Sequence, residues 1–337
     1  MPNSATVFAI IAAWFKNVLI PFLLLTIAIH GPFSSSSSQV RLGTSVKRAA
    51  IVTCISPLSI MQTAATIPHV KTIVGRLYLW KLFRVEADQE ALTSLSSNVS
   101  TGLALRTLRF DVFFPNKFKI RGKLEKNGKQ KAMLFLPGFM VDHTSYASIA
   151  SRMASEGDII VVVLSLEPLR IADEYLADLF ELKQCIRSVT KLWNRRSKNN
   201  GGSLEWSIGG HSYGGYAAMR LAPQLADYLH TSSTDKLKVV VWASGNREDF
   251  LTDLSLRDDI SALVLLGSND RICKFDSAEK QRLDSYLPSD ALIQSIGGGT
   301  HNNFASYPGQ SVVNGVPGIS RMEQHKKVSS ATITFLN

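Results

Sequence analysis

Residues 207–218 read SIGGHSYGGYAA, and this stretch decides the fold. A short strand-like run at residues 204–208 comes before it, and a helical pattern at residues 216–229 follows it. The pentapeptide GHSYG therefore lies on a strand-to-helix turn, which is where the G-x-S-x-G nucleophile elbow occurs. Its glycines are needed because side chains there would collide with the adjoining strand and helix. The pattern predicts that Ser212 is a nucleophile with an exposed hydroxyl.

A serine nucleophile needs a general base, and the base needs an acidic group that orients it. After this kind of turn the partners follow in the order Ser, Asp or Glu, His. Asp270 comes just after a buried strand-like run at residues 260–266, and His301 lies on a glycine-rich loop. We predict that Ser212, Asp270 and His301 form a catalytic triad. Glu248 and Asp249 are alternative acids, because they also follow a strand-like run.

The backbone donors that would stabilise a tetrahedral oxyanion are also predictable. One is the N–H of the residue after the nucleophile, and the other comes from the loop after an earlier strand. Residues 132–136 are an apolar strand-like run that leads into Pro137-Gly138. This nominates the N–H groups of Tyr213 and Phe139, with Met140 as the neighbouring alternative. His211 precedes the nucleophile, so its ring should point away into a packed or hydrogen-bonded position.

Together these motifs resemble the alpha/beta hydrolase superfamily over about residues 131–324. They are most similar to its small single-domain branch related to dienelactone hydrolases, alpha/beta hydrolase fold-5. The matching pieces are LPG at 136–138, GGHS at 209–212, VWAS at 241–244, GSND at 267–270 and GGGTHNNF at 297–304. Residues 134–163 also resemble chlorophyllases, another branch of the fold.

The resemblance implies an alpha/beta hydrolase fold, in which helices flank a mostly parallel eight-stranded sheet, and the triad Ser212–Asp270–His301. Two positions depart from the branch: Thr300 stands where Asn is usual, and Tyr213 stands where Leu is usual. Both departures alter the wall of the pocket, so the resemblance does not carry over a substrate.

The wider pattern agrees with an α/β fold. Strand-like segments, the first at residues 106–114 and 118–125, alternate with helical ones at 145–156 and 173–195, as in a doubly wound parallel sheet. The separation between Ser212 and Asp270 is too short for a large cap domain. We assign residues 98–337 to a single hydrolase domain, long enough to bury a sizeable core.

The net charge of +10 reflects the N-terminal region. Eight of the 37 basic residues lie in residues 1–85, which contain no acid, and the remaining 29 nearly balance the 27 acidic ones. A near-neutral domain argues against a nucleic-acid partner. Three cysteines show no metal-ligand spacing, so we expect neither a metal nor another cofactor.

The N-terminal region has the composition of a targeting or anchoring segment. Residues 1–33 are expected to be a signal peptide or membrane anchor, with possible membrane association through the apolar residues 6–29. Residues 34–97 form a basic, Ser-rich, transit-like or stem segment. Both readings predict entry into the secretory pathway. With a signal peptide followed by a transit segment, the protein would continue to the plastid of a secondary-plastid organism. With a membrane anchor followed by a stem, it would stay in the endoplasmic-reticulum membrane.

The sequence therefore predicts a serine hydrolase that cleaves a carboxylic ester or thioester, with esterase-, lipase- or thioesterase-like activity on a small ester or lipid-like molecule. The alternative is a non-catalytic acyl- or lipid-binding member of the fold, because fold alone does not give function. An intact Ser, Asp, His order favours the enzyme. Ester, lipid, thioester and pigment-ester chemistry share this machinery, so the substrate stays open.

Overall fold

The computed structural model describes residues 84–116, 129–165, 178–197, 203–244, 252–308 and 314–337. None of the helices within these ranges is long and apolar enough to cross a membrane. The expected anchor at residues 6–29 and the expected strand at residues 118–125 lie outside the described residues, as do Glu248 and Asp249.

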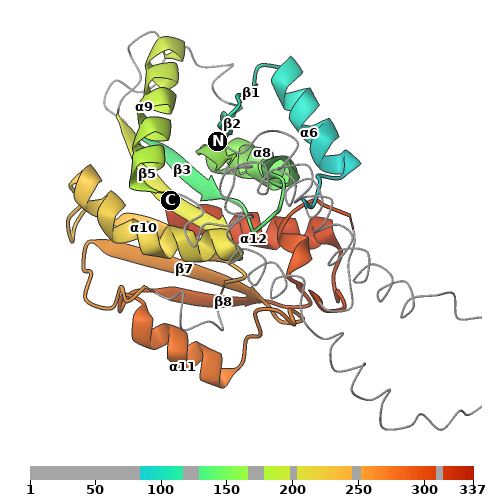
Figure 1. Ribbon diagram of the computed structural model, residues 1–337, viewed down its shortest axis with the longest axis vertical. Coiled ribbons are helices and arrows are strands. Elements are labelled where there is room, and N and C mark those ends of the chain that lie inside the picture. Colours follow the sequence, from blue (N-terminus) through green and yellow to red (C-terminus); the bar gives the residue numbers. More distant parts are fainter. Residues whose placement is uncertain (1–83, 117–128, 166–177, 198–202, 245–251, 309–313) are drawn as a thin grey trace, which may run out of the picture. The chain divides into compact units, whose positions relative to one another are not determined.

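Eight strands form one sheet in the order β1-β2-β4-β3-β5-β6-β7-β8 (Figure 1). The first pairings, β1 with β2 and β2 with β4, are antiparallel, and all the others are parallel. This confirms the mostly parallel eight-stranded sheet. The strands are β1 (Ala104–Arg106), β2 (Phe110–Phe113), β3 (Gln130–Leu136), β4 (Ile160–Leu164), β5 (Leu204–His211), β6 (Leu237–Trp242), β7 (Ile260–Gly267) and β8 (Leu292–Ile296).

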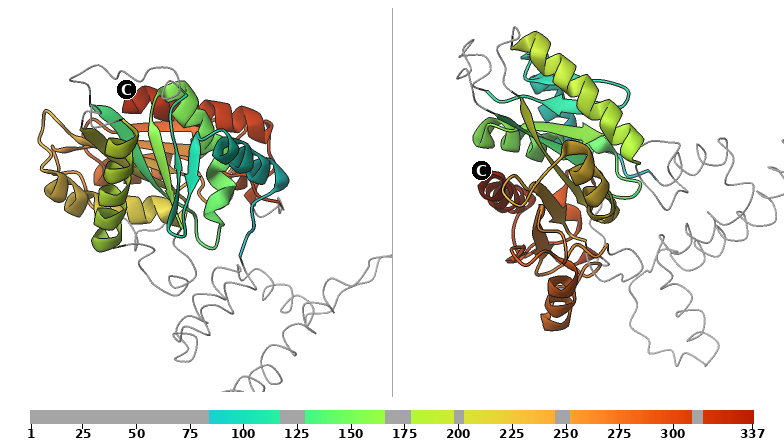
Figure 2. Two further views of the ribbon diagram at one scale, coloured as in Figure 1. Left: turned by 90° about the horizontal axis from the view of Figure 1, so that it is seen from above. Right: turned by 90° about the vertical axis from the view of Figure 1, so that its left-hand side faces the viewer.

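Helices cover both faces of the sheet (Figure 2). The helices α9 (Leu179–Arg196) and α10 (Tyr213–Leu229) pack on one face, where α11 (Ser277–Tyr286) also contributes Leu283 to the core. The other face carries α6 (Gln89–Ser100), α8 (Ala147–Gly157) and α12 (Arg321–Leu336). Central strands such as β4, which reads IVVVL, are buried throughout because helices lie on both sides of them.

The expected strand at residues 106–114 is in fact two strands. Thr107 makes the turn between β1 and β2: its hydroxyl accepts a hydrogen bond from the N–H of Phe110 (3.0 Å) and donates one to the Phe110 carbonyl (2.7 Å). The chain therefore reverses here, and β1 becomes the edge of the sheet. Within the described residues no large cap domain interrupts the sheet, as expected.

Residues 84–97 lie against the α/β core, although their composition placed them in the stem segment. Ala91 and Leu95 of α6 are buried in the same cluster as Ile149 and Met153 of α8. Just before this helix, Val85 pairs with Val141 in an isolated parallel bridge. The folded domain therefore includes residues that precede the expected boundary at residue 98.

Candidate active site

Ser212 occupies the turn between β5 and α10 with φ 54° and ψ −122°, a left-handed conformation that is costly for a residue with a side chain. Gly210 and Gly214 make this turn possible. A Cβ atom on Gly210 would overlap the Gly214 backbone, and one on Gly214 would overlap the carbonyls of Leu136 and Pro137. The turn leaves the Ser212 side chain half-buried at the carboxyl edge of the sheet, where α/β proteins bind their ligands.

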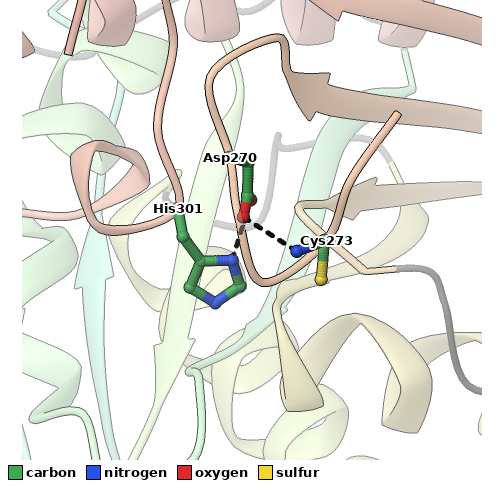
Figure 3. Close-up of side chains that lie close together, drawn as sticks. All are labelled: Asp270, Cys273 and His301. Carbon is green, nitrogen blue, oxygen red and sulfur yellow. Dashed lines mark hydrogen bonds and ion pairs between the residues drawn. The ribbon is translucent and has the colours of Figure 1, made fainter. Parts of the chain in front are cut away.

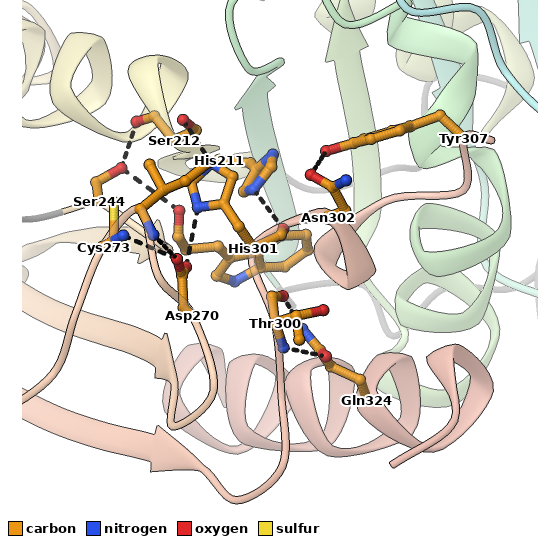
Figure 4. A network of polar contacts seen from close by, with 12 residues as sticks. His211, Ser212, Ser244, Asp270, Cys273, Thr300, His301, Asn302, Tyr307 and Gln324 are labelled. Carbon is orange, nitrogen blue, oxygen red and sulfur yellow. Dashed lines mark hydrogen bonds and ion pairs between the residues drawn. The ribbon is translucent and has the colours of Figure 1, made fainter. Parts of the chain in front are cut away.

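The structure brings the three predicted triad residues together. The Ser212 hydroxyl lies 2.9 Å from His301 Nε2, and His301 Nδ1 lies 2.9 Å from Asp270 Oδ2. The three residues follow the carboxyl ends of β5, β7 and β8. In the sheet β7 and β8 are adjacent, and β6 lies between β5 and β7. Figure 4 shows the His301 ring between the serine and the carboxylate. This geometry suits a base that takes the serine proton.

Asp270 is fixed by the loop on which it lies. Its Oδ1 atom accepts hydrogen bonds from the N–H groups of Ile272 (2.7 Å) and Cys273 (2.8 Å), which leaves Oδ2 for His301. The side chain is 0% exposed, so water does not compete for these bonds. The carboxylate is therefore held in one orientation toward the imidazole.

The side chains of the two residues that carry the candidate oxyanion donors lie next to each other. Tyr213 is the first residue of α10, and N–H groups in the first turn of a helix have no acceptor within the helix. Phe139 lies on the loop after β3, and its ring centroid is 5.6 Å from that of Tyr213. Backbone hydrogen bonds fix this loop on both sides of Phe139, because Val141 N–H donates to the Gly138 carbonyl and Val85 N–H donates to the Met140 carbonyl.

A buried amide holds the loop of His301, and no sequence motif predicts it. Gln324 of α12 is fully buried, its Oε1 accepts from the N–H of Thr300 (3.0 Å), and its Nε2 donates to the Thr300 carbonyl (2.9 Å). Both backbone groups of the residue before His301 are thus bound by one side chain, as Figure 4 shows. Such a long-range contact leaves no local pattern, so only the distance between Thr300 and Gln324 in the fold reveals it.

His211 points away from the nucleophile, as expected. Its ring is 1% exposed and stacks on the ring of Phe304 at 5.6 Å. Its Nδ1 lies 2.8 Å from the Tyr146 hydroxyl, and its Nε2 lies 3.2 Å from the His301 carbonyl.

Asp270, Cys273 and His301 form the one cluster of potential metal ligands in the described part of the chain (Figure 3). Their ligand atoms lie within 4.8 Å of one another. Both ring nitrogens of His301 are already hydrogen-bonded, to Asp270 and to Ser212. A cation at this cluster would have to break one of those bonds, so metal binding would compete with the triad geometry.

The chain has no significant match among curated proteins. Solved structures that it resembles include a dienelactone hydrolase-like promiscuous phosphotriesterase from metagenomic libraries (14% identity, TM-score 0.40, covering 67% of this chain and 90% of that one). A second is a dienelactone hydrolase from Anabaena variabilis (16% identity, TM-score 0.41, covering 68% of this chain and 92% of that one). A third is an esterase from Pyrobaculum calidifontis (14% identity, TM-score 0.44, covering 79% of this chain and 97% of that one). The profile of the alpha/beta hydrolase family matches residues 132–326, more than half of the chain. This chain therefore belongs to the alpha/beta hydrolase family.

Proposed function

We propose that this chain is a serine hydrolase that cleaves a carboxylic ester or thioester through an acyl-enzyme on Ser212. The observation that carries the proposal is the unbroken hydrogen-bonded series from the Ser212 hydroxyl through His301 to the buried Asp270. A serine hydroxyl becomes a useful nucleophile only beside such a base.

The proposed reaction has two halves. In the first, Ser212 Oγ attacks the carbonyl carbon while His301 Nε2 takes the serine proton, which gives a tetrahedral oxyanion. The intermediate collapses, the bond to the leaving alcohol or thiol breaks, and His301 returns the proton to that leaving group. In the second half, water loses a proton to His301 and attacks the acyl carbon. The acid then leaves, and His301 returns the proton to Ser212.

The remaining groups have electrostatic roles. Asp270 holds the imidazole with its Nδ1–H toward the carboxylate, which leaves Nε2 as the acceptor and stabilises the imidazolium that forms. The N–H groups of Phe139 and Tyr213 would donate to the oxyanion, aided by the positive end of α10. Loss of one such donor typically costs about 3–4 kcal/mol of transition-state stabilisation.

The half-buried rings beside the nucleophile support a small-molecule ester or a lipid-like substrate. Phe139 and Tyr213 are partly exposed next to Ser212 and contact each other. An apolar wall of this kind favours an apolar acyl or alcohol group.

Turnover of a chain-length series of aryl esters, with one acyl thioester, tests the proposal. Ser212→Ala should lower kcat by about 10⁴- to 10⁶-fold, as loss of the nucleophile does in triad enzymes. Ser285→Ala is the matched control, because this exposed serine lies on α11, where its hydroxyl bonds only the Arg282 carbonyl. Equal turnover in the wild-type chain and in Ser212→Ala would reject the proposal and favour a non-catalytic binding role.

A further inference from the structure

A buried polar chain runs beneath the nucleophile, from the loop of the proposed oxyanion donor to the backbone of the catalytic base. The Gly138 N–H lies 2.9 Å from the Tyr146 hydroxyl, which lies 2.8 Å from His211 Nδ1. The other end of the same imidazole, Nε2, lies 3.2 Å from the His301 carbonyl. Tyr146 is 0% exposed and His211 1%, so water does not replace any of these bonds.

The direction of each hydrogen bond follows from what its ends can do. A backbone N–H only donates, so the Tyr146 oxygen accepts from Gly138. A carbonyl only accepts, so His211 Nε2 carries the proton that is donated to His301. A neutral imidazole has no second proton, so Nδ1 is an acceptor and the Tyr146 O–H donates to it. All four groups are then satisfied in a single arrangement.

The protonation states agree with this arrangement. Burial holds the pKa of His211 well below its usual value, and the neighbouring His301 lowers it further, so the ring is neutral. Burial likewise holds the pKa of Tyr146 well above its usual value, which keeps the hydroxyl proton in place as a donor.

We propose that Tyr146 and His211 are positioning residues that fix the oxyanion loop and the loop of the catalytic base relative to each other. The inference rests on the proposed function. Gly138 is the neighbour of Phe139, and the His301 carbonyl belongs to the base itself, so the two ends of this chain lie within one residue of the reacting groups.

Packing alone does not account for the pair. The Tyr146 ring already packs against Phe135, with the ring centroids 5.0 Å apart, and the His211 ring contacts Phe304 and His301. Phenylalanine would supply the same ring contacts at both positions. Burying polar atoms where apolar ones would fit is costly unless every bond is made. The polar atoms are therefore explained by the two backbone groups that they bind.

The test compares four variants of the full chain by kcat and KM for an aryl ester and by the rate of labelling with a fluorophosphonate. Tyr146→Phe and His211→Phe keep the rings and remove the bonds, and each should lower kcat and the labelling rate about 10- to 100-fold, with a smaller change in KM. His211→Gln keeps an amide that can donate to the His301 carbonyl, and should recover part of the loss.

Ser207→Ala is the matched control, because it removes a buried hydroxyl on β5 that bonds the Ala132 carbonyl at 3.1 Å and lies outside the chain from Gly138 to His301. This variant should lower the melting temperature about as much as Tyr146→Phe does, but keep kcat within about twofold of the wild-type value. A loss of stability alone need not change the geometry of the reacting groups. Reduced melting temperatures with unchanged kcat in Tyr146→Phe and His211→Phe would overturn the inference. If Tyr146→Phe does not fold, the two His211 variants test the inference alone, and a reduced melting temperature with unchanged kcat in His211→Phe would overturn it. Absence of any label on Ser212 in the unaltered chain would overturn the proposed function, and this inference with it.

Discussion

At the scale of single residues, Ser212 combines its proposed chemical role with an unfavourable backbone conformation. Its φ of 54° places Cβ where only glycine is comfortable, and such a residue costs about 1–3 kcal/mol. Surrounding contacts impose the conformation, since Ser212 N–H donates to the Trp242 carbonyl (2.8 Å) and the Ser244 hydroxyl donates to the Ser212 carbonyl. The strain is thus a property of the position and not of the serine side chain.

Replacing Ser212 by glycine should therefore stabilise the fold relative to replacing it by alanine. We expect the free energy of unfolding of Ser212→Gly to exceed that of Ser212→Ala by about 1 kcal/mol, because glycine adopts this conformation without a clash. Both variants lack the nucleophile, so they differ only in Cβ. Chemical unfolding followed by circular dichroism measures the difference, and a less stable glycine variant would show that the turn is not strained.

The site residues that belong to a sequence motif could be predicted. The residues that only hold the motif residues in place could not. Ser212, Asp270 and His301 each follow a strand-like run, in an order that the elbow dictates. Tyr146 and Gln324 belong to no motif that dictates their partners, and the fold alone brings them to His211 and Thr300. Their roles follow only from the fold.

At the scale of elements, the C-terminal helix α12 supports the loop that carries the proposed base His301. Gln324 binds both the N–H and the carbonyl of Thr300, and the loop before it, GGG at residues 297–299, offers little stiffness of its own. A helix is a rigid support, so the position of His301 depends on α12.

Gln324→Met should loosen this loop, because methionine fills the space without bonding Thr300. The two buried backbone groups would lose their partners, at about 1–3 kcal/mol each, and kcat should fall about tenfold or more. Ser329→Ala on the same helix is the control: its buried hydroxyl bonds the His325 carbonyl at 2.7 Å and does not reach the loop. Steady-state kinetics of both variants give the comparison. A loss of kcat in Ser329→Ala as large as in Gln324→Met would mean that general destabilisation explains both.

Most elements of the sheet could be predicted from their apolar runs, and the misses have physical causes. The strands β4 and β7 are strongly apolar because helices cover both faces, and this gives a clear pattern. The helix α6, which reads QEALTSLSSNVS, is rich in serine and buries only Ala91 and Leu95. Its sequence therefore looked like an unfolded stem, and tertiary packing on α8 decides its structure.

At the scale of the whole molecule, the folded domain begins earlier than the expected boundary at residue 98. Val85 N–H donates to the Met140 carbonyl, Asp142 N–H donates to the Val85 carbonyl, and Arg84 pairs with Asp142. These contacts hold the loop of the proposed oxyanion donor Phe139. The acid-free composition that suggested a leader ends at the same place, at residue 85.

A shortened chain that starts at Arg84 should therefore fold and be active, whereas one that starts at Asn98 should be less stable and less active. The shorter chain loses the burial of Leu95, worth about 2 kcal/mol by itself, and the backbone bonds of Val85 to the oxyanion loop. Thermal unfolding and ester turnover of the two chains provide the measurement. Equal stability and turnover would show that α6 and Val85 are dispensable.

Buried neutral histidines make the fold sensitive to acid. Burial, with smaller contributions from Arg321 and Arg152, lowers the pKa of His325 on α12 to about 4. The unfolded chain binds a proton at this residue below about pH 6.5, and the folded chain does so only near pH 4. Stability should therefore fall as the pH drops from about 6.5 to 4, by up to about 3 kcal/mol from this one residue.

His325→Gln should reduce the slope of unfolding free energy against pH in this window relative to the wild-type chain, because glutamine does not titrate. Denaturant unfolding at several pH values between 4 and 7 measures both slopes. The buried His211 contributes in the same direction, because its pKa is also lowered. Identical slopes in the wild-type chain and in His325→Gln would refute the assignment.

The central claim, that Ser212 forms a covalent acyl-enzyme with His301 as its base, is tested most directly by the mass of the protein after brief exposure to a fluorophosphonate. We expect a single adduct on the full chain, which peptide mapping assigns to Ser212. The adduct should be absent from Ser212→Ala and form far more slowly in His301→Ala, because the base activates the serine. An unlabelled wild-type chain, or an adduct that persists in Ser212→Ala on another residue such as Cys273, would contradict the account.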